Sequence, residues 1–405
     1  RYTVEAELPG FQRSVRELTL TLQADPVIDF TLTVGAVDTE IVITGEAPLV
    51  ETSSASLKGL VDQQQIQDLP LNGRSFTDLV ALQTGVSLNY NQLALDNAAT
   101  AKFSINGARS VQSSYQLDGT ELRNHWGSTP GSTAGTMLGV DTVQEFSVIT
   151  TVAAAEYGNF AGGVINAVTR SGTNEFHGTL FEFHRNQALD ARNFFDPGDS
   201  PPDFVRNQYG FTMGGPVIPD TLFFFGSFEA LNQRLSTTRV STVPSMASRA
   251  GTFVDELGGN VTPSPVTQPI LNAYPVPNGT GACKGPGGII CDFLWTNPGV
   301  TDEYFYLMKV DWQITELDSI GVRYLLDDSE RSDFQDGHGL GRTPSQSRNQ
   351  YLMLDWNRVF STSMVNDARV SYNRSPILTE VDFEGCCPES MHYNNKLFFS
   401  GKPRY

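Results

Sequence analysis

The sequence predicts a mixed fold, in which a small α/β domain is followed by a long series of antiparallel β-strands. Three observations support this prediction. The chain changes character across residues 156–185, where glycines supply tight turns between β-prone segments. After this junction, aromatic-rich segments alternate apolar and polar positions with a period of two. The connections between those segments are short and long in turn.

The composition excludes several classes of function. A net charge of −18 and a pI near 4.6 argue against nucleic acid as a partner, because phosphate binding needs clustered Lys and Arg. No apolar run of about 18 residues is present, so no transmembrane helix is expected. Transmembrane strands of roughly ten alternating residues remain compatible with this composition. Both chain ends fall in β-like sequence, so we expect a fragment of a longer protein.

Residues 1–37 alternate apolar and polar positions, and Pro9-Gly10 marks a hairpin turn. The pattern YTVEAELPGF followed by VIDFTLTVG resembles the last strands of the carboxypeptidase-regulatory-like β-sandwich. We therefore expect the C-terminal part of such a sandwich here. Residues 38–50 are rich in Thr, Glu and Pro and are expected to form a linker.

The next region, residues 51–172, has the pattern of a small mixed domain. Residues 63–69 and 75–82 are predicted helices, and residues 143–150 and 164–169 are predicted strands. A hairpin is predicted between residues 102–106 and 113–117, because Asn106-Gly107 and Asp118-Gly119 are strong turn signals.

Three separated segments of this region resemble, in the right order, the plug domain of TonB-dependent outer-membrane receptors. They are LVETSSASLKGLVDQQQIQDLPLNGRSFTDLVALQTGV, SINGARSVQSSYQLDGTELRN and VQEFSVITTVAAAEYGNFAGGVINAVTRSGTNEFHGTLFEFHRN. The most similar subtype is the Oar-like one, which carries an N-terminal carboxypeptidase-regulatory-like domain. The resemblance identifies residues 51–172 as a plug and marks its motif turns, at Asn106, Gly107, Arg109, Asp118 and Gly119.

Residues 173–405 are expected to form the first part of an antiparallel transmembrane β-barrel, with about seven strands. Short connections are predicted at residues 218–220, 315–319 and 361–364, and long ones at residues 188–206, 233–302 and 328–347. Outer-membrane barrels have this asymmetry because one rim carries tight periplasmic turns and the other carries long outer loops. Trp312, Trp356 and Phe360 lie near the short turns, as expected for an interfacial aromatic girdle.

The chain carries no recognisable catalytic motif, so neither an enzyme nor a cofactor is expected. His177 and His184 fall on opposite faces of one predicted strand and do not form a metal site. An acidic patch in a predicted outer loop has oxygen ligands suitable for Ca²⁺, but its spacing is not that of an EF-hand, and a solvated loop is the preferred interpretation. The patch consists of Asp327, Asp328, Glu330, Asp333 and Asp336.

The four cysteines form two local pairs, Cys283 with Cys291 in a Gly/Pro-rich loop and Cys386 beside Cys387. Loop disulfides in an oxidising compartment are the preferred interpretation. A zinc site is the alternative, but no histidine stands at ligand spacing near either pair. No metal site is therefore predicted.

The resemblance implies an outer-membrane receptor that imports an unidentified extracellular ligand, contacts outer-membrane lipid, and takes energy from a TonB-type inner-membrane transducer. The family couples to that partner through a TonB box ahead of the plug. The matching segment here is Glu40, Ile41, Val42, Ile43 and Thr44, whose β-branched residues suit strand addition to a partner. The alternative is that these residues form the last strand of the preceding sandwich.

The resemblance also implies that the apical part of the plug, residues 124–137, takes part in substrate binding. Asn124, His125 and Trp126 are the candidates, with Trp126 able to stack on a flat ligand. A flexible loop with a packed tryptophan is the competing interpretation. Two other functions remain open: an adhesion, assembly or export platform built on a plugged barrel, and a soluble carbohydrate-binding protein.

Overall fold

The computed structural model describes most of the chain and divides it into two compact units. Unit 1 contains Arg1–Gln92, Ala101–Pro130 and Val140–Arg170, and unit 2 contains Leu93–Thr100, Gly131–Gly139 and Ser171–Tyr405. The described residues are 2–18, 22, 27–34, 41–44, 57–69, 74, 77–88, 103–122, 131–134, 139–151, 157–158, 160–192, 201–251, 262–265, 267–279, 281, 283–285, 288–334, 342–380, 392–393 and 396–397.

Unit 1 begins with a small three-stranded sheet in the order β1 (Tyr2–Ala6), β2 (Ser14–Leu18) and β3 (Ile41–Thr44). β1 and β2 are antiparallel, and Gly10 at φ 88° allows the turn between them. β3 pairs with β2 in parallel and lies at an edge of the sheet. The segment expected as a linker over residues 38–50 therefore includes a hydrogen-bonded strand.

The second sheet of unit 1 has the order β4-β9-β10-β7-β8. Its strands are β4 (Leu57–Val61), β7 (Ser114–Leu117), β8 (Thr120–Glu121), β9 (Val143–Thr151) and β10 (Val164–Thr169). Two helices, α1 (Gln63–Asp68) and α2 (Thr77–Val80), occur where helices are predicted. Asp62 and Gln65 form a capping box that fixes the start of α1. Apolar side chains from the strands and helices form one buried core: Val61, Ile66, Val80, Phe103, Phe146 and Val164.

The hairpin predicted around Asn106-Gly107 is wrong. β6 (Phe103–Ile105) pairs with β5 (Val86–Leu88), and the 3-10 helix η2 (Ser110–Gln112) carries the chain onward to β7. β7 instead pairs with β8 across Asp118-Gly119 and in parallel with β10. Both turn signals are genuine, because each pair has two positive φ angles, but a turn residue does not determine which strand becomes the partner.

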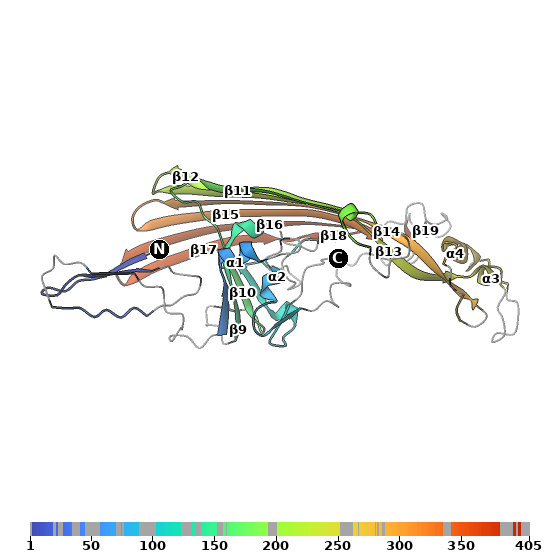
Figure 1. Cartoon of the computed structure of the whole chain (residues 1–405), viewed down its shortest axis with the longest axis horizontal. Coiled ribbons are helices and arrows are strands. Elements are labelled where there is room, and N and C mark those ends of the chain that lie inside the picture. Colours follow the sequence, from blue (N-terminus) through green and yellow to red (C-terminus); the bar gives the residue numbers. More distant parts are fainter. Residues whose placement is uncertain are drawn as a thin grey trace. The chain divides into compact units, whose positions relative to one another are not determined.

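Unit 2 is dominated by one large sheet whose strands are antiparallel and follow chain order (Figure 1). They are β11 (His177–Asn186), β12 (Phe204–Ile218), β13 (Leu222–Pro244), β14 (Ile290–Gln313), β15 (Asp318–Phe334), β16 (Arg342–Ser361) and β17 (Met364–Arg374). β18 (Ile377–Thr379) pairs with β16 beyond the end of β17. The sheet does not close on itself within the described residues. Smaller elements complete the description: η3 (Val140–Thr142), η4 (Gln187–Leu189), α3 (Met246–Arg249), α4 (Thr267–Ala273), β19 (His392–Tyr393) and β20 (Lys396–Leu397).

Several strands of the large sheet are longer than predicted. β13 and β14 remain paired from Leu222↔Trp312 to Pro244↔Ile290, so much of the predicted loop at residues 233–302 is a two-stranded arm. β15 and β16 likewise extend into the predicted loop at residues 328–347. The extension of β13 is rich in Thr and Val, which favour strands, but it lacks apolar alternation because neither face needs to be apolar there.

The junction at residues 156–185 separates the two units. β10 belongs to the mixed sheet of unit 1, and β11 belongs to the large antiparallel sheet of unit 2. The short connections occur as predicted, with Asp220 at φ 62° in the turn between β12 and β13. No helix among the described residues is long and apolar enough to cross a membrane.

Candidate functional site

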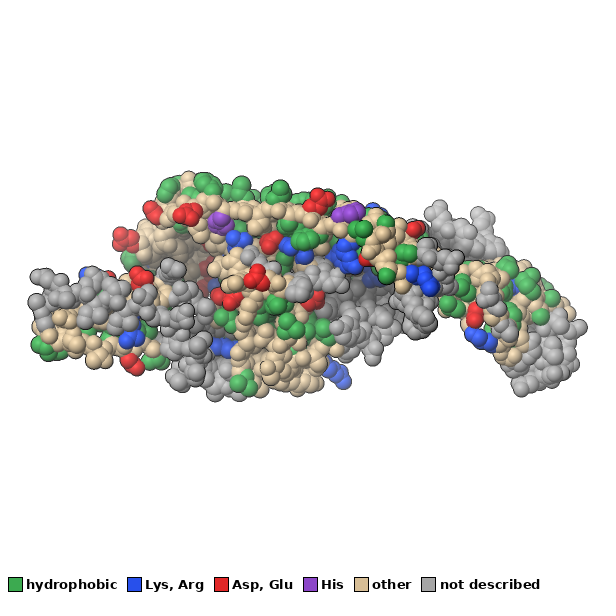
Figure 2. Space-filling model, viewed as in Figure 1, with side chains coloured by type: hydrophobic (Ala, Val, Ile, Leu, Met, Phe, Trp, Pro, Cys, Tyr) green, Lys and Arg blue, Asp and Glu red, His purple; other side chains and the backbone are tan. Residues whose placement is uncertain are grey.

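The large sheet has an apolar face that is exposed, which reverses the arrangement of a soluble protein. On β14 the alternate positions Tyr306, Met308 and Val310 are exposed, whereas Phe305, Leu307 and Lys309 between them are buried. The same pattern holds on neighbouring strands, and hydrophobic side chains follow the outline of the sheet in Figure 2. We call this surface the apolar face. Its further members include Tyr209, Phe211, Met213, Val322, Tyr324, Leu352, Leu354, Trp356, Val370 and Tyr372.

The apolar face is packed by aromatic contacts between strands. The ring of Phe228 lies 6.4, 6.0 and 5.0 Å from the rings of Tyr209, Phe211 and Tyr306. Aromatic side chains that cluster on an exposed surface need an apolar solvent or a partner. The hydrocarbon layer of a membrane is such an apolar solvent, and it surrounds transmembrane strands.

The opposite surface, here called the polar face, carries charged and polar side chains that are buried. One row across five strands contains Gly210, Glu229, Phe305, Asp327 and Asn349. Glu229 and Asp327 are each 1% exposed. The neighbouring row contains Gln208, Leu231, Glu303, Ser329 and Ser347.

Glu229 is held by two hydrogen bonds at the centre of the polar face. Gln208 Nε2 donates to its Oε1 at 2.7 Å, and the Gly139 backbone N–H donates to its Oε2 at 3.0 Å. Arg206 Nη2 in turn donates to Gln208 Oε1 at 3.1 Å. A buried carboxylate requires such donors, because leaving it unpaired would be costly.

Residues 131–134 also contact the polar face through hydrogen bonds. The Thr133 N–H donates to Ser329 Oγ at 3.1 Å and to Ser347 Oγ at 3.0 Å, and the Thr133 and Ser329 hydroxyls lie 2.8 Å apart. Asn349 Nδ2 donates to Gly131 O at 3.1 Å. We call these contacts the polar latch. Each bond contributes only about 1 kcal/mol net and can be replaced by water, so such a contact can form and break reversibly.

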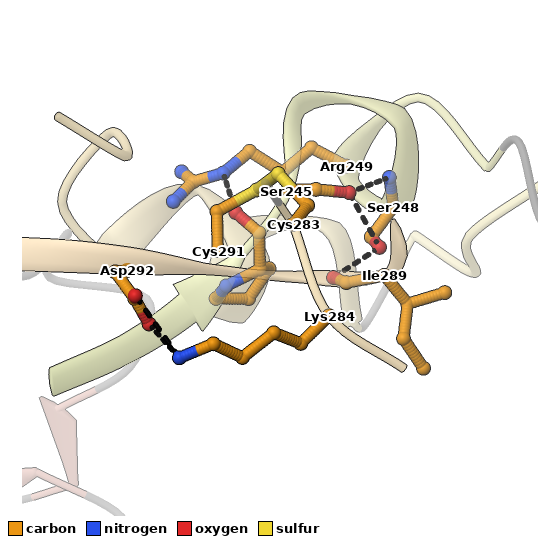
Figure 3. Close-up of a disulfide and its surroundings, with 9 residues drawn as sticks. Ser245, Ser248, Arg249, Cys283, Lys284, Ile289, Cys291 and Asp292 are labelled. Atoms are coloured by element: carbon orange, nitrogen blue, oxygen red, sulfur yellow. Dashed lines mark hydrogen bonds and ion pairs between the residues drawn. A yellow bond between two sulfur atoms is a disulfide. The ribbon is translucent and has the colours of Figure 1, made fainter. Parts of the chain in front are cut away.

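The β13–β14 arm ends in a compact tip that contains a disulfide between Cys283 and Cys291 (Figure 3). Arg249 donates to the backbone carbonyls of Pro244, Tyr274 and Pro275 at 3.2, 2.9 and 2.5 Å. Partial burial lowers the pKa of the Arg249 guanidinium. These interactions join α3 to the chain that follows α4.

Two further polar contacts hold the tip together. Ser248 Oγ donates to Ile289 O at 2.6 Å, and Lys284 Nζ lies 2.9 Å from Asp292 Oδ1 (Figure 3). The tip is therefore a cross-linked unit at the end of a long strand pair.

The structure describes only some of the residues singled out from the sequence. Asn124, His125 and Trp126 lie outside the described residues, as do Cys386 and Cys387. Asn106 and Asp118 adopt φ angles of 50° and 48°, each followed by a glycine with positive φ, at Gly107 and Gly119. The Arg109 N–H donates to Gln112 Oε1 at 3.0 Å.

Four residues of the acidic patch expected in an outer loop, Asp327, Asp328, Glu330 and Asp333, are instead part of strand β15, and Asp336 lies outside the described residues. Asp328 and Glu330 lie on the side of the apolar face, and Asp327 lies on the polar face. Alternation along a strand therefore separates residues that are adjacent in sequence. No group of three acidic, His or Cys side chains among the described residues is arranged to hold a metal ion. His177 and His184 lie on opposite faces of β11, as their odd spacing predicts.

Residues 131–134 of the polar latch fall within the segment 124–137 that was expected to take part in substrate binding, but their contacts with the large sheet were not predicted from the sequence. Thr133 and Ser347 are 214 residues apart, and serine and threonine on a strand carry no pattern that indicates a distant partner. The register of four strands is needed to place Gln208, Glu229 and Ser329 on one face of the sheet. Only the alternation on β14 and β15 indicated that this face would be polar.

Two protein families match the chain and together account for most of its length. Residues 50–165 match the TonB-dependent Receptor Plug Domain, and residues 168–386 match an Outer membrane beta barrel domain. The boundary between the two matches falls at the end of β10, close to the division between the two units.

Individual relatives agree with the family matches. The TonB-dependent transporter Oar of Myxococcus xanthus is 28% identical over 270 residues, covering 63% of this chain and 24% of that protein. The probable TonB-dependent siderophore receptor PirA of Acinetobacter baumannii is 25% identical over 231 residues, covering 55% of this chain and 29% of that protein. The chain thus spans about a quarter of the length of these relatives.

A solved structure shows the same fold. The outer membrane transporter YddB from Escherichia coli superposes with a TM-score of 0.51 at 15% sequence identity, over 78% of this chain and 38% of that one. The exposed apolar face, the buried polar face and the family matches lead to one conclusion. The chain belongs to the TonB-dependent receptors of the outer membrane, with a plug domain followed by an outer-membrane β-barrel domain.

Proposed function

We propose that the protein is an outer-membrane receptor that binds an extracellular substrate and imports it with energy supplied through the TonB system. Its family consists of transporters, not enzymes. The PirA relative is named a probable siderophore receptor, so a ferric siderophore is the first substrate class to test. The observation that carries the proposal is the polar latch. In the proposed mechanism residues 131–134 leave the strands of the large sheet, and hydrogen bonds to hydroxyl groups permit that movement at small cost.

A reversible cross-link across the polar latch tests this proposal. The pair Thr133→Cys and Ser347→Cys is chosen because the Thr133 backbone N–H lies 3.0 Å from Ser347 Oγ, so the two introduced side chains would be close together. In the complete protein, oxidation of this pair is expected to stop energised uptake while surface binding of substrate persists. Reduction should restore uptake. The measurement is accumulation of labelled ferric siderophore by whole cells, compared with binding at 4 °C.

The single variant Thr133→Cys, treated with the same oxidant and reductant, is the matched control. It accounts for any effect of the reductant on the native Cys283–Cys291 disulfide. Undiminished uptake by the fully cross-linked protein would contradict import by displacement of this segment.

We further propose that residues 40–44 act as the TonB box, with Ile41–Thr44 also forming strand β3. β3 lies at the edge of its sheet, and a free strand edge can accept a further strand from a partner. This proposal combines the two interpretations of Glu40, Ile41, Val42, Ile43 and Thr44. Coupling would occur either at the free edge or after β3 leaves β2.

Proline substitution tests the assignment of the TonB box. Val42→Pro removes a backbone N–H donor and fixes φ, so it prevents regular strand pairing on one side of β3. Energised uptake is expected to be lost, with surface binding of substrate unchanged. Val42→Ile, which keeps both the N–H and the β-branched shape, should transport normally. Wild-type uptake by the proline variant would remove this segment from the coupling pathway.

The β13–β14 arm supports a second candidate function, an adhesion, assembly or export platform. The arm continues for 14 residues beyond Ala230, which corresponds to about 45 Å of strand. Replacing residues 236–298 by Asn-Gly would join Leu235 to its register partner Gly299 by a tight turn. Loss of cell or matrix adhesion with this short arm, together with no saturable uptake by the wild type, would favour the platform.

We propose the following domain organisation: residues 1–37 as the C-terminal part of a carboxypeptidase-regulatory-like sandwich, 38–50 as linker, 51–172 as plug, and 173–405 as barrel wall. The sheet formed by β1, β2 and β3 supports a β-rich module ahead of the plug. The periplasmic partner is a TonB-type transducer, and the net charge of −18 argues against nucleic acid as a partner.

A further inference from the structure

A cavity of about 630 Å³ lies on the same side of the large sheet as the apolar face. Strands β14 to β18 contribute its lining, mostly at positions that continue those of the apolar face, and Ser329 and Ser347 of the polar face also line it. Side chains of both charges are present, together with two apolar groups. The lining includes Tyr304, Asp328, Glu330, Arg348, Arg374 and Leu378.

The cavity lies where the apolar face changes into a charged surface. Along β15, the exposed side changes from Tyr324 and Leu326 to Asp328 and Glu330. Along β17, Tyr372 is followed at the next alternate position by Arg374. This is the rim of the long connections, which faces outward in barrels of this family. The cavity therefore lies at the level of the lipid headgroups in the outer leaflet.

The cavity lining carries the carboxylates of Asp302, Asp328 and Glu330 and the guanidinium groups of Arg348 and Arg374. Arg348 pairs with Asp328, with Nε 3.1 Å from Oδ2, and Arg234 pairs with Asp302 at 3.0 Å. Arg374 is exposed and donates one hydrogen bond, from Nη1 to Gln350 Oε1 at 3.4 Å. A guanidinium has five N–H donors, so Arg374 can still bind a phosphate through two parallel bonds.

We propose that this cavity binds the phosphorylated headgroup of one outer-leaflet lipid. Arg374 donates to the phosphate oxygens, and Arg348 supplies the second cation from the facing strand. The acyl chains extend along the apolar face below, over Leu326 and Leu352. A free phosphate ion would contact the arginines but would leave the apolar face uncovered. Because the cavity continues into the apolar face, we favour a lipid as the ligand.

Native mass spectrometry of the complete detergent-solubilised protein tests the proposal. The probes are dioleoyl phosphatidic acid, which carries a phosphate monoester, and dioleoyl phosphatidylcholine, whose quaternary ammonium screens its phosphate. The wild type is expected to retain one phosphatidic acid in preference to phosphatidylcholine. Arg374→Gln should retain roughly tenfold less, because a bidentate charged contact is lost.

Two further variants make the result specific to the cavity. Arg239→Gln removes an exposed arginine on the β13–β14 arm, outside the cavity, and should retain as much phosphatidic acid as the wild type. Glu330→Gln removes a carboxylate from the cavity and should increase retention, because the repulsion of phosphate is reduced.

The proposal is overturned if Arg374→Gln retains phosphatidic acid like the wild type, or if Arg239→Gln loses as much as Arg374→Gln does. Lower retention in Glu330→Gln would indicate a cationic ligand instead. Displacement of the lipid by millimolar inorganic phosphate would indicate a site for a free anion. Retention that follows the predicted order, and is insensitive to inorganic phosphate, supports a lipid headgroup site.

Discussion

Asp118 connects two strands of the plug sheet through one side chain. It adopts φ 48° at the turn between β7 and β8. Its Oδ1 accepts a hydrogen bond from the Thr169 N–H, and its Oδ2 accepts one from the Thr169 hydroxyl, both at 2.8 Å. Aspartate and asparagine tolerate the left-handed region better than other residues with a Cβ atom. The residue thus combines a conformational role with two hydrogen bonds to β10.

Replacement of Asp118 by alanine is expected to destabilise the plug by roughly 2–3 kcal/mol, from the two lost hydrogen bonds and the cost of positive φ. Hydrogen exchange at residues 164–169 of the complete protein should accelerate accordingly. Asp118→Asn keeps the conformational tolerance and a carbonyl acceptor, so it should lose about half as much protection. Equal protection in the wild type and the alanine variant would show that the turn alone determines the fold here.

At this scale, sequence reasoning identified turn residues but not their partners. Asn106-Gly107 and Asp118-Gly119 have the backbone angles that the residue types predict. The hydrogen bonds from Thr133 to Ser329 and Ser347 could not be predicted, because they depend on the register of a sheet and on the path of a distant segment. Local propensity carries no information about either.

Among the elements, the β13–β14 arm differs most from its prediction. Apolar alternation identifies a strand only where one of its faces contacts an apolar phase. The alternation stops near Asn232, so the predicted strand ended there. The strands continue to Pro244 because Thr and Val favour extended backbone and the two strands satisfy each other's hydrogen bonds. For the same reason, residues 328–334 of β15 were expected to form a loop.

The tip of the arm should lose local order when its disulfide is removed. The bond closes a loop with a sequence separation of 8 residues, for which chain entropy predicts roughly 2–3 kcal/mol. Cys283→Ser combined with Cys291→Ser is expected to accelerate hydrogen exchange in residues 283–291. Exchange in β15 and β16, which lie outside the tip, should remain unchanged. Unaltered exchange at the tip would mean that the contacts of Arg249 and Ser248 suffice without the disulfide.

For the whole molecule, the decisive property is that the large sheet exposes its apolar face and buries its polar face. Sequence alternation on β14 predicted two chemically distinct faces, and a soluble sheet would show the same alternation. The structure adds which face is buried, and it is the one that carries Glu229, Glu303 and Lys309. That assignment requires the neighbouring strands together with residues 131–134 and Gly139, which a pattern along one strand does not contain.

A pair of arginine substitutions tests the lipid environment directly. Met308 and Val240 are similarly exposed, at 67% and 62%, but only Met308 lies on the apolar face within the span of the membrane. Met308→Arg is expected to destabilise the complete protein in liposomes by roughly 2–4 kcal/mol, whereas Val240→Arg on the arm should be nearly neutral. The measurement is the urea midpoint of folding into liposomes. Equal midpoints for the two variants would be expected of a soluble sheet.

The dimensions of the apolar face have a consequence for the membrane that this chain can occupy. Eight residue steps separate Tyr304 from Trp312 on β14, which corresponds to about 27 Å along the strand. A barrel strand tilted by about 40° reduces this length to about 20 Å along the bilayer normal, before the reach of the terminal side chains is added. A hydrocarbon layer of about 30 Å would exceed that height, and the bilayer would have to thin around the protein. The short height of the apolar face therefore suits this sheet to a membrane with a thin hydrocarbon layer and disfavours a thicker one.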